Sequence, residues 1–203
     1  MSETEFYLVR HGQTESNVRK RIQGQSNSQL TENGIKQAHQ LGKRLQGISF
    51  DKLISSTLDR AHHTAQVLES YVKLKAEKNS SFQEISFGSA EGKTWEEVRE
   101  ADPKLNEDWR NHVLDVALPG GESRNTAMDR VIPELEGIAK EHDGDRILIV
   151  THGGILAALF GAILRIPSGQ RPLCIIDNTS INILRFKDDI WKLKTWGDTA
   201  HLS

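Results

Sequence analysis

Short apolar runs of strand length alternate along this chain with longer segments in which apolar residues recur at helical spacing. Strands are predicted over residues 6–9, 50–56 and 147–151, where Leu, Ile, Val and Phe are concentrated. Helices are predicted over residues 31–45 and 59–75, because each places its apolar side chains on one face. Strands that alternate with helices indicate an α/β fold, here a three-layer sandwich with a mixed, mostly parallel sheet between helical layers.

The second half of the chain continues the alternation and ends in extended segments. Helices are predicted over residues 123–141 and 155–164, and Pro133 is expected to kink the first of them. Extended segments are expected at residues 81–85, 172–176, 180–186 and 191–195. The last two segments are expected to form a hairpin, whose free edge could pair with a second copy in a homodimer.

Residues 90–121 depart from this rhythm. They are charged and polar, and they contain Trp95 and Trp109, which are expected to pack this segment. A chain of 203 residues is the right size for one domain with a substantial core. We therefore expect a single domain over residues 1–203, with residues 90–121 as a lid-like insertion.

Composition excludes several classes of protein. The 26 Lys and Arg residues nearly balance the 28 Asp and Glu residues, so no overall field favours nucleic acid or an anionic membrane. No apolar run approaches the ~20 residues that span a bilayer, and the acidic start shows no signal segment. The single cysteine, Cys174, lies in an apolar stretch that predicts a buried structural thiol. A cytoplasmic protein is the simplest interpretation.

Candidate chemistry gathers where the predicted strands end. Arg10 and His11 follow the first strand, His152 follows the strand at 147–151, and Arg60 opens the helix after the strand at 50–56. The carboxyl ends of parallel strands share one edge of a sheet, which is where α/β proteins bind ligands. Two imidazoles and two guanidiniums at one edge need a strong anion, and phosphate suits arginine forks best.

An imidazole at this edge can act as a nucleophile towards phosphorus. We expect a backbone carbonyl to hold one ring nitrogen of His11, so that the other nitrogen is free to attack. Gly12 is expected to allow close approach of the substrate. Arg10 and Arg60 would meet the charge on the transferred phosphoryl group. For Arg60 the alternative is a surface ion pair with Asp59 or Glu69.

Further polar residues can complete such a site. Asn17 can donate an amide hydrogen to phosphate or can cap a turn, and Gln23 with Gly24 lies on a loop that could add a backbone donor. A leaving alkoxide needs a proton, for which Glu84 is the best candidate by position. Partial desolvation would keep Glu84 protonated. Glu91 is the rival acid, although its neighbours favour a structural role in which it caps backbone donors.

Residues 8–17, LVRHGQTESN, resemble the signature of the histidine phosphatase superfamily, in the branch that contains cofactor-dependent phosphoglycerate mutase. Other segments match that family in order: residues 23–24, 30–34, 55–65, 84–92, 119–123 and 150–153. The resemblance covers nearly the whole chain. It implies a phosphoglycerate mutase-like fold with no metal, and we expect no cofactor.

The resemblance also implies roles for individual residues. His11 would be the phosphorylated nucleophile and Glu84 the proton donor. The phosphate pocket would be formed by Arg10, Asn17, Arg60 and His152, and we count Gln23, Gly24 and Gly153 with it.

The activity implied is hydrolysis of a small phosphorylated metabolite through a phosphohistidine. Mutases of the family carry an adjacent basic pair after the catalytic glutamate, whereas residues 90–121 hold only the scattered Lys93, Arg99, Lys104, Arg110 and His112. The chain therefore resembles the shorter phosphatases more closely. A phosphoglycerate mutase that depends on a bisphosphate primer, and a silent binder of phosphorylated ligands, remain as alternatives.

Overall fold

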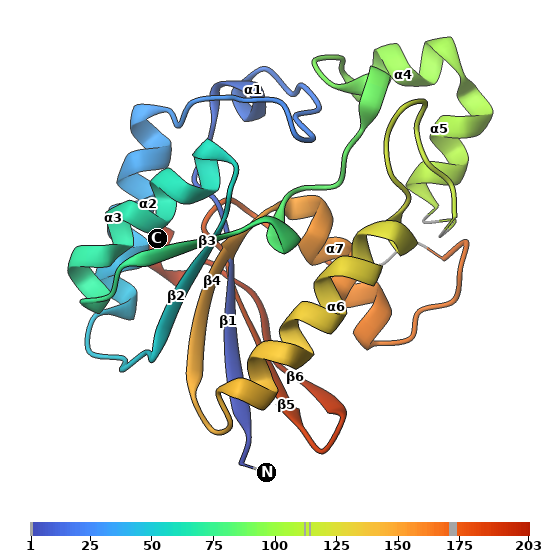
Figure 1. The fold of residues 1–203 in the computed structure, drawn as a ribbon. Coiled ribbons are helices and arrows are strands. Elements are labelled where there is room, and N and C mark those ends of the chain that lie inside the picture. Colours follow the sequence, from blue (N-terminus) through green and yellow to red (C-terminus); the bar gives the residue numbers. More distant parts are fainter. Residues whose placement is uncertain (1, 112, 114, 171–173) are drawn as a thin grey trace.

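A six-stranded sheet forms the centre of the computed structural model, which describes residues 2–111, 113, 115–170 and 174–203 (Figure 1). The strands are β1 (Thr4–Arg10), β2 (Lys52–Ser56), β3 (Ala76–Asn79), β4 (Arg146–Thr151), β5 (Ile181–Lys187) and β6 (Ile190–Asp198). Their order across the sheet is β3-β2-β4-β1-β5-β6. The first four pair in parallel, and β5 runs antiparallel to both β1 and β6. The sheet is therefore mixed and mostly parallel, as predicted.

Helices cover both faces of this sheet. The long helices are α2 (Glu32–Leu45), α3 (Asp59–Val72), α6 (Arg124–Glu141) and α7 (Gly153–Ile163). Side chains alternate along β1, so that Tyr7 and Val9 join the core beneath α2 and α3, while Phe6 and Leu8 join the core beneath α6 and α7. Two apolar cores on opposite faces confirm the predicted three-layer fold.

Short elements lie at the edge where β1, β2 and β4 end (Figure 1). They are α1 (Glu15–Val18), α4 (Trp95–Ala101), α5 (Pro103–Arg110) and the 3-10 turns η1 (Ser80–Phe82), η2 (Gly88–Ala90) and η3 (Ala200–Leu202). Helices α4 and α5 belong to the segment 90–121, whose action as a lid stays a prediction, as does the single-domain boundary. His112 lies outside the described residues.

The extended segment predicted at residues 81–85 is wrong. The strand of this region is β3, which is four residues long and pairs with β2 at the edge of the sheet. The side chain of Asn79 accepts a hydrogen bond from the backbone N–H of Ser81 at 2.9 Å and begins the turn η1. An edge strand whose central residues are exposed lacks the apolar pattern that marks a buried strand.

The segment predicted at residues 172–176 also differs. Residues 171–173 lie outside the described part, and residues 174–176 form no strand. The C-terminal hairpin of β5 and β6 is confirmed.

Helix boundaries differ from the prediction where the backbone changes conformation. Helix α3 ends at Val72 rather than residue 75, because Lys73 adopts a left-handed φ of 59° that stops the helix. Helix α6 begins behind Ser123, whose side chain caps it, and continues through Pro133. Among the described residues, no helix combines the length and apolar character that a membrane crossing requires.

Candidate active site

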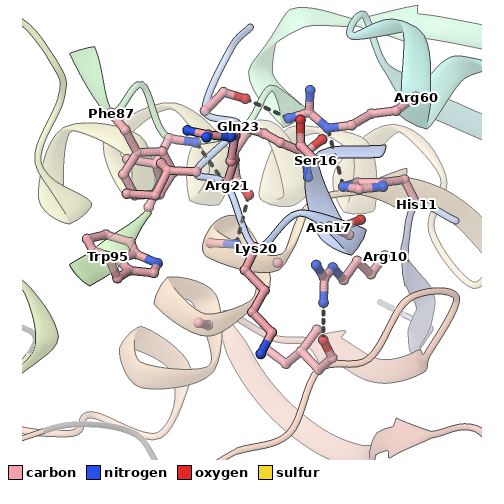
Figure 2. A pocket seen from close by; sticks show the side chains of 18 of the residues that line it. Arg10, His11, Ser16, Asn17, Lys20, Arg21, Gln23, Arg60, Phe87 and Trp95 are labelled. Carbon is pink, nitrogen blue, oxygen red and sulfur yellow. Dashed lines mark hydrogen bonds between the residues drawn. The ribbon is translucent and has the colours of Figure 1, made fainter. Parts of the chain in front are cut away.

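The strand ends open onto a cavity of about 550 Å³ (Figure 2). Most of the predicted site residues line it: Arg10, His11, Asn17, Gln23, Gly24, Arg60, Glu84 and Gly153. His152 is the exception, because its side chain is fully buried behind the cavity wall, with its ring centre 5.2 Å from that of His11. Its predicted contact with phosphate therefore stays a prediction.

His11 is held in one tautomer. Its Nδ1 lies 2.8 Å from the carbonyl oxygen of Gly12, which can only accept, so Nδ1 carries the hydrogen. Its Nε2 then accepts a hydrogen bond from Nε of Arg60 at 3.3 Å (Figure 2). This confirms that a backbone carbonyl orients the ring and leaves Nε2 with its lone pair.

Both imidazoles are neutral in this environment. Burial lowers the pKa of His11 well below its usual range, and the guanidiniums of Arg60 and Arg10 lower it further. Burial likewise lowers the pKa of His152, whose Nε2 lies 2.8 Å from the hydroxyl of Ser56. A neutral His11 retains the electron pair that an attack on phosphorus requires.

Gly12 is needed for a different reason from the predicted one. A Cβ at this position would lie 2.5 Å from the carbonyl oxygen of Gly34, in the first turn of α2. The backbone of α2 therefore makes a close approach at Gly12, and the predicted approach of a substrate stays a prediction. The amide of Gly12 donates to the hydroxyl of Thr64 at 3.0 Å, which fixes the loop against α3.

Arg60 is buried inside the site, with only 2% of its side chain exposed. It donates to the carbonyl oxygens of Ser26 at 2.9 Å and Gly24 at 2.6 Å, as well as to His11. Its burial makes the alternative of a surface ion pair wrong. Burial also lowers its pKa to about 10, so that Arg60 stays charged at neutral pH.

Arg10 has an N–H group that no described residue accepts from. Its Nη1 donates to the carbonyl oxygen of Ile176 at 2.7 Å (Figure 2), while its buried Nε has no hydrogen-bond partner among the described residues. A Cβ on Gly153 would lie 3.2 Å from this Nε. The absence of a side chain at Gly153 thus leaves room for the guanidinium of Arg10 at the start of α7.

The loop around Gly24 is held by hydrogen bonds to Glu91 and to Arg60. Glu91 accepts hydrogen bonds from the backbone N–H groups of Gln25, Ser26 and Phe87 at 3.0–3.1 Å, which confirms its predicted structural role. Gly24 has a φ of +53°, and its carbonyl oxygen is taken by Arg60.

Gln23 and Asn17 meet at Thr14. The side-chain oxygen of Gln23 accepts from the hydroxyl of Thr14 at 3.0 Å, so Gln23 supports the loop. The side-chain oxygen of Asn17 accepts from the backbone of Thr14 at 3.1 Å and from the amide of Asn178 at 3.2 Å. Asn17 therefore caps the turn of α1 with its oxygen, and its amide nitrogen remains the group that can donate to a ligand.

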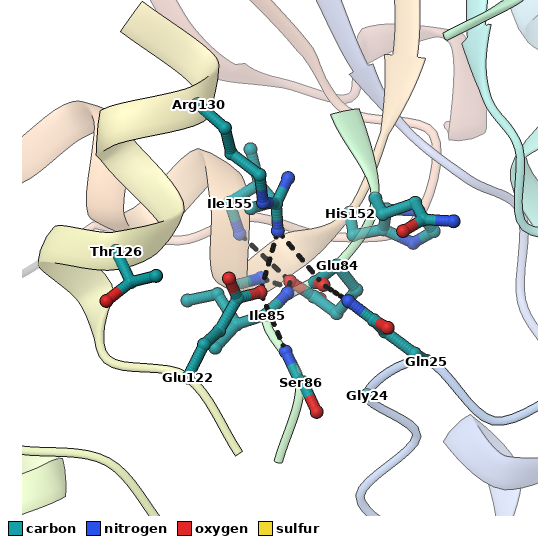
Figure 3. A network of polar contacts seen from close by, with 12 residues as sticks. Gly24, Gln25, Glu84, Ile85, Ser86, Glu122, Thr126, Arg130, His152 and Ile155 are labelled. Carbon is teal, nitrogen blue, oxygen red and sulfur yellow. Dashed lines mark hydrogen bonds and ion pairs between the residues drawn. The ribbon is translucent and has the colours of Figure 1, made fainter. Parts of the chain in front are cut away.

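Glu84 lies between η1 and η2 and lines the cavity, and its carboxylate contacts the start of α7 (Figure 3). Its Oε1 accepts from the backbone N–H groups of Ile85 at 2.9 Å and Ile155 at 3.1 Å, and its Oε2, among the described residues, accepts only from Gly154 at 2.9 Å. Oε2 is thus the oxygen with room for a proton. A Cβ on Gly154 would lie 2.5 Å from Oε1, so this glycine is needed for the contact.

The backbone of Glu84 is fixed by a second set of contacts (Figure 3). Arg130, on α6, donates to the carbonyl oxygens of Ser81 at 2.6 Å and Glu84 at 3.3 Å, and it pairs with Glu122 at 2.8 Å. Glu122 in turn accepts from the N–H of Ser86 at 3.0 Å. Within the described residues, no group of three or more His, Cys, Asp or Glu side chains could hold a metal ion.

A sequence model of the histidine phosphatase superfamily, branch 1, matches residues 6–199. The chain belongs to that superfamily. The curated relatives include a metal-independent phosphoserine phosphatase of Arabidopsis thaliana, 36% identical over 98% of this chain and 84% of the relative. Another is a probable phosphoglycerate mutase of Salmonella newport, 33% identical over 98% of this chain and 94% of the relative.

Solved structures similar to this chain have the same fold. YhfR of Bacillus stearothermophilus superposes with a TM-score of 0.90 at 32% identity, over 98% of this chain and all of that one. A mycobacterial glucosyl-3-phosphoglycerate phosphatase, solved in complex with VO3, has a TM-score of 0.88 at 29% identity, over 96% of this chain and 99% of that one. The chain is therefore an enzyme of the histidine phosphatase superfamily, with phosphatases among its relatives.

Two residues that line the cavity differ from the sequence interpretation or were absent from it. Cys174 is half-buried and lines the cavity, so it is not the fully buried thiol that was predicted. Arg124 also lines the cavity, from the first turn of α6, and lies over the ring of Trp109. The sequence offered no signal for Arg124, because a single arginine at the start of an amphipathic helix is usually solvated.

Proposed function

We propose that this enzyme hydrolyses a small phosphomonoester, without a metal ion, through a phosphohistidine formed on His11. The observation that carries the proposal is the neutral, oriented imidazole of His11, whose Nε2 lies beside Arg60 at the wall of the cavity. The phosphatases among its relatives support a hydrolytic outcome.

In the first step, Nε2 of His11 attacks phosphorus and the bond to the leaving oxygen breaks. Arg10 and Arg60 stabilise the negative charge that spreads over the phosphoryl oxygens in the transition state, and the amide of Asn17 adds a neutral donor. Glu84 gives a proton from Oε2 to the leaving alkoxide, since only an acid or water can supply it. The free alcohol then leaves.

In the second step, the Glu84 carboxylate takes a proton from a water molecule as that water attacks phosphorus. The bond between phosphorus and Nε2 breaks, inorganic phosphate forms, and the neutral imidazole of His11 is restored. Glu84 is protonated again at the end, so one carboxyl group serves as acid and then as base. We assign His152 to the same phosphate pocket, where its neutral ring packs against His11.

The position of the basic residues of the 90–121 segment favours hydrolysis over mutase activity. A mutase must retain a bisphosphate intermediate while it reorients, which requires a closed and strongly basic pocket. The described basic residues of the 90–121 segment are all exposed: Lys93, Arg99, Lys104 and Arg110. None of these four lines the cavity.

A panel of phosphomonoesters, assayed for phosphate release with and without EDTA, tests the proposal. We expect release in both conditions, an acid-labile phosphoenzyme, and loss of both in His11→Ala. His63→Ala, which removes an exposed imidazole of α3, is the matched control and should retain activity.

Three results would contradict hydrolysis at His11. Turnover that survives intact in His11→Ala would exclude the phosphohistidine. Interconversion of 3- and 2-phosphoglycerate without phosphate release would establish the mutase alternative. Binding of phosphorylated ligands with no turnover of any ester would establish the silent binder.

A further inference from the structure

Arg124 is a buried cation that the proposed reaction does not use. Only 6% of its side chain is exposed, yet its guanidinium forms no hydrogen bond or ion pair with any described residue, and its buried Nη1 has no partner. It lines the same cavity as His11. The carbon at the centre of the guanidinium lies 3.8 Å from the ring centre of Trp109.

This position is unfavourable for a positive charge without a ligand. Burial removes the guanidinium from water, and the contact with Trp109 replaces only part of the lost hydration. Arg124 is also the first residue of α6, where the helix dipole disfavours a cation. Burial lowers its pKa to about 10, which still leaves the group charged at neutral pH. An anion in the cavity would reverse these costs.

The geometry favours recognition of a planar anion. A guanidinium that lies over an aromatic ring keeps its N–H groups at its edge, where they can form two parallel bonds to a carboxylate. The cavity wall beside it is aromatic, since Phe87 and Trp95 pack with Trp109 at ring-centre distances of 5.4–6.5 Å. This wall supplies apolar contact for the body of a small leaving group.

We infer that Arg124 binds a carboxylate on the leaving group, and that the enzyme thereby selects small phosphomonoesters that carry a carboxylate. The inference rests on the proposed function, because it assumes that the phosphoryl end lies between Arg10, Arg60 and His11. Arg124 is then a specificity-determining residue that touches substrate but takes no part in the chemical steps.

A carboxylate fits better than a second phosphate. The pocket assigned to the phosphoryl group supplies two guanidiniums, Arg10 and Arg60, for a dianion. At the other end Arg124 is the buried cation, whereas Lys20 and Arg21, which also line the cavity, are exposed. One negative charge is matched by one buried guanidinium, whereas a second dianion would leave one of its charges without a buried partner.

Two matched substrate pairs test this assignment. The pairs are 3-phosphoglycerate with glycerol 3-phosphate, and 4-carboxyphenyl phosphate with phenyl phosphate. Arg124→Met keeps the length of the side chain over Trp109 but removes its charge and donors. We expect kcat/KM for the carboxylated member of each pair to fall about 10- to 100-fold, as for the loss of hydrogen bonds to a charged group. The member of each pair without a carboxylate should stay within about 3-fold, because it loses no hydrogen bond to Arg124.

Two further variants separate recognition from structure. Arg124→Lys keeps the charge without the fork, and we expect an intermediate ratio within each pair. Arg110→Met, an exposed residue next to Trp109 on α5, is the matched control and should leave the ratio unchanged. An equal loss on both members of a pair in Arg124→Met, or an unchanged ratio, would overturn the assignment.

Binding measurements keep this test independent of turnover. The Kd values of both pair members are also measured by calorimetry in His11→Ala and in His11→Ala with Arg124→Met. A preference for the carboxylated member that disappears with Arg124 supports the inference even if hydrolysis at His11 is disproved. Absence of that preference in His11→Ala overturns the inference even if hydrolysis at His11 is established.

Discussion

Lowering the pH from about 7.5 to about 5.5 is predicted to destabilise this enzyme through its two buried imidazoles. His11 and His152 have folded pKa values well below the value of about 6.5 for an unfolded histidine. Above that value neither state binds a proton. Below a pH of about 6.5 the histidines of the unfolded chain bind protons that the folded imidazoles do not bind, so the free energy of unfolding falls as the pH falls.

The size of the effect follows from the proton uptake of the unfolded chain alone. Where the folded imidazole binds no proton in this range, each imidazole costs RT ln(11/1.1), which sets an upper limit of about 1.4 kcal/mol between the two pH values. The upper limit for the pair is therefore about 2.7 kcal/mol, a large part of the ~5–15 kcal/mol by which domains are stable. Both side chains are almost completely buried, so solvent screening does not reduce this figure.

Urea unfolding at the two pH values, in buffer without phosphate, measures the effect. Other groups also titrate, so the informative quantity is the pH-dependent loss in wild type minus that in His152→Asn, expected to be positive and to reach at most about 1.4 kcal/mol. Leu68→Ala removes a buried apolar side chain of α3 without removing a titrating group, and it should show the wild-type loss. An equal loss in His152→Asn and wild type would mean that the folded imidazole accepts a proton, and the neutral site would be wrong.

Two further predictions concern the groups that position the reacting side chains. Gly154→Ala places a Cβ against the Glu84 carboxylate and should lower kcat about 100-fold, as for loss of a general acid. The control Gly137→Ala lies at an open site in α6 and should raise the free energy of unfolding by about 0.5–1 kcal/mol. Wild-type kcat in Gly154→Ala would show that the contact is dispensable. Ser56→Ala leaves Nε2 of His152 without its hydroxyl partner and should cost about 1–3 kcal/mol in urea unfolding, and a change below about 0.5 kcal/mol would exclude that bond as a stabilising one.

Much of the reaction centre could be predicted because each of its residues follows a strong local pattern. The apolar runs before His11 and His152 predict two strands, and parallel pairing then brings their ends together. In the structure β1 and β4 pair in register, with Arg10 opposite Thr151, so the two histidines become neighbours. The structural role predicted for Glu91, as a cap of backbone donors, is likewise confirmed. Its neighbour Gly92 indicates a turn, and a turn supplies free backbone N–H groups.

Other features depend on residues far apart in the chain. The need for Gly12 arises from the carbonyl of Gly34, and no property of residues 8–17 indicates that contact. Arg124 is buried because α5 brings Trp109 against it, a contact between two elements that no periodicity predicts. The edge strand β3 lacks an apolar signal because only one neighbour, β2, specifies it.

The amino-acid sequence alone thus determined the layers of the fold, the shared edge of the sheet and the order of the candidate groups along it. Period-2 and period-3.6 patterns are local properties that decide which face of an element is buried. The tertiary structure alone decided the tautomer of His11, the acceptor role of the Glu84 oxygens and the burial of Arg124. These depend on which polar atoms of distant segments meet without water, and that is settled only when the elements pack.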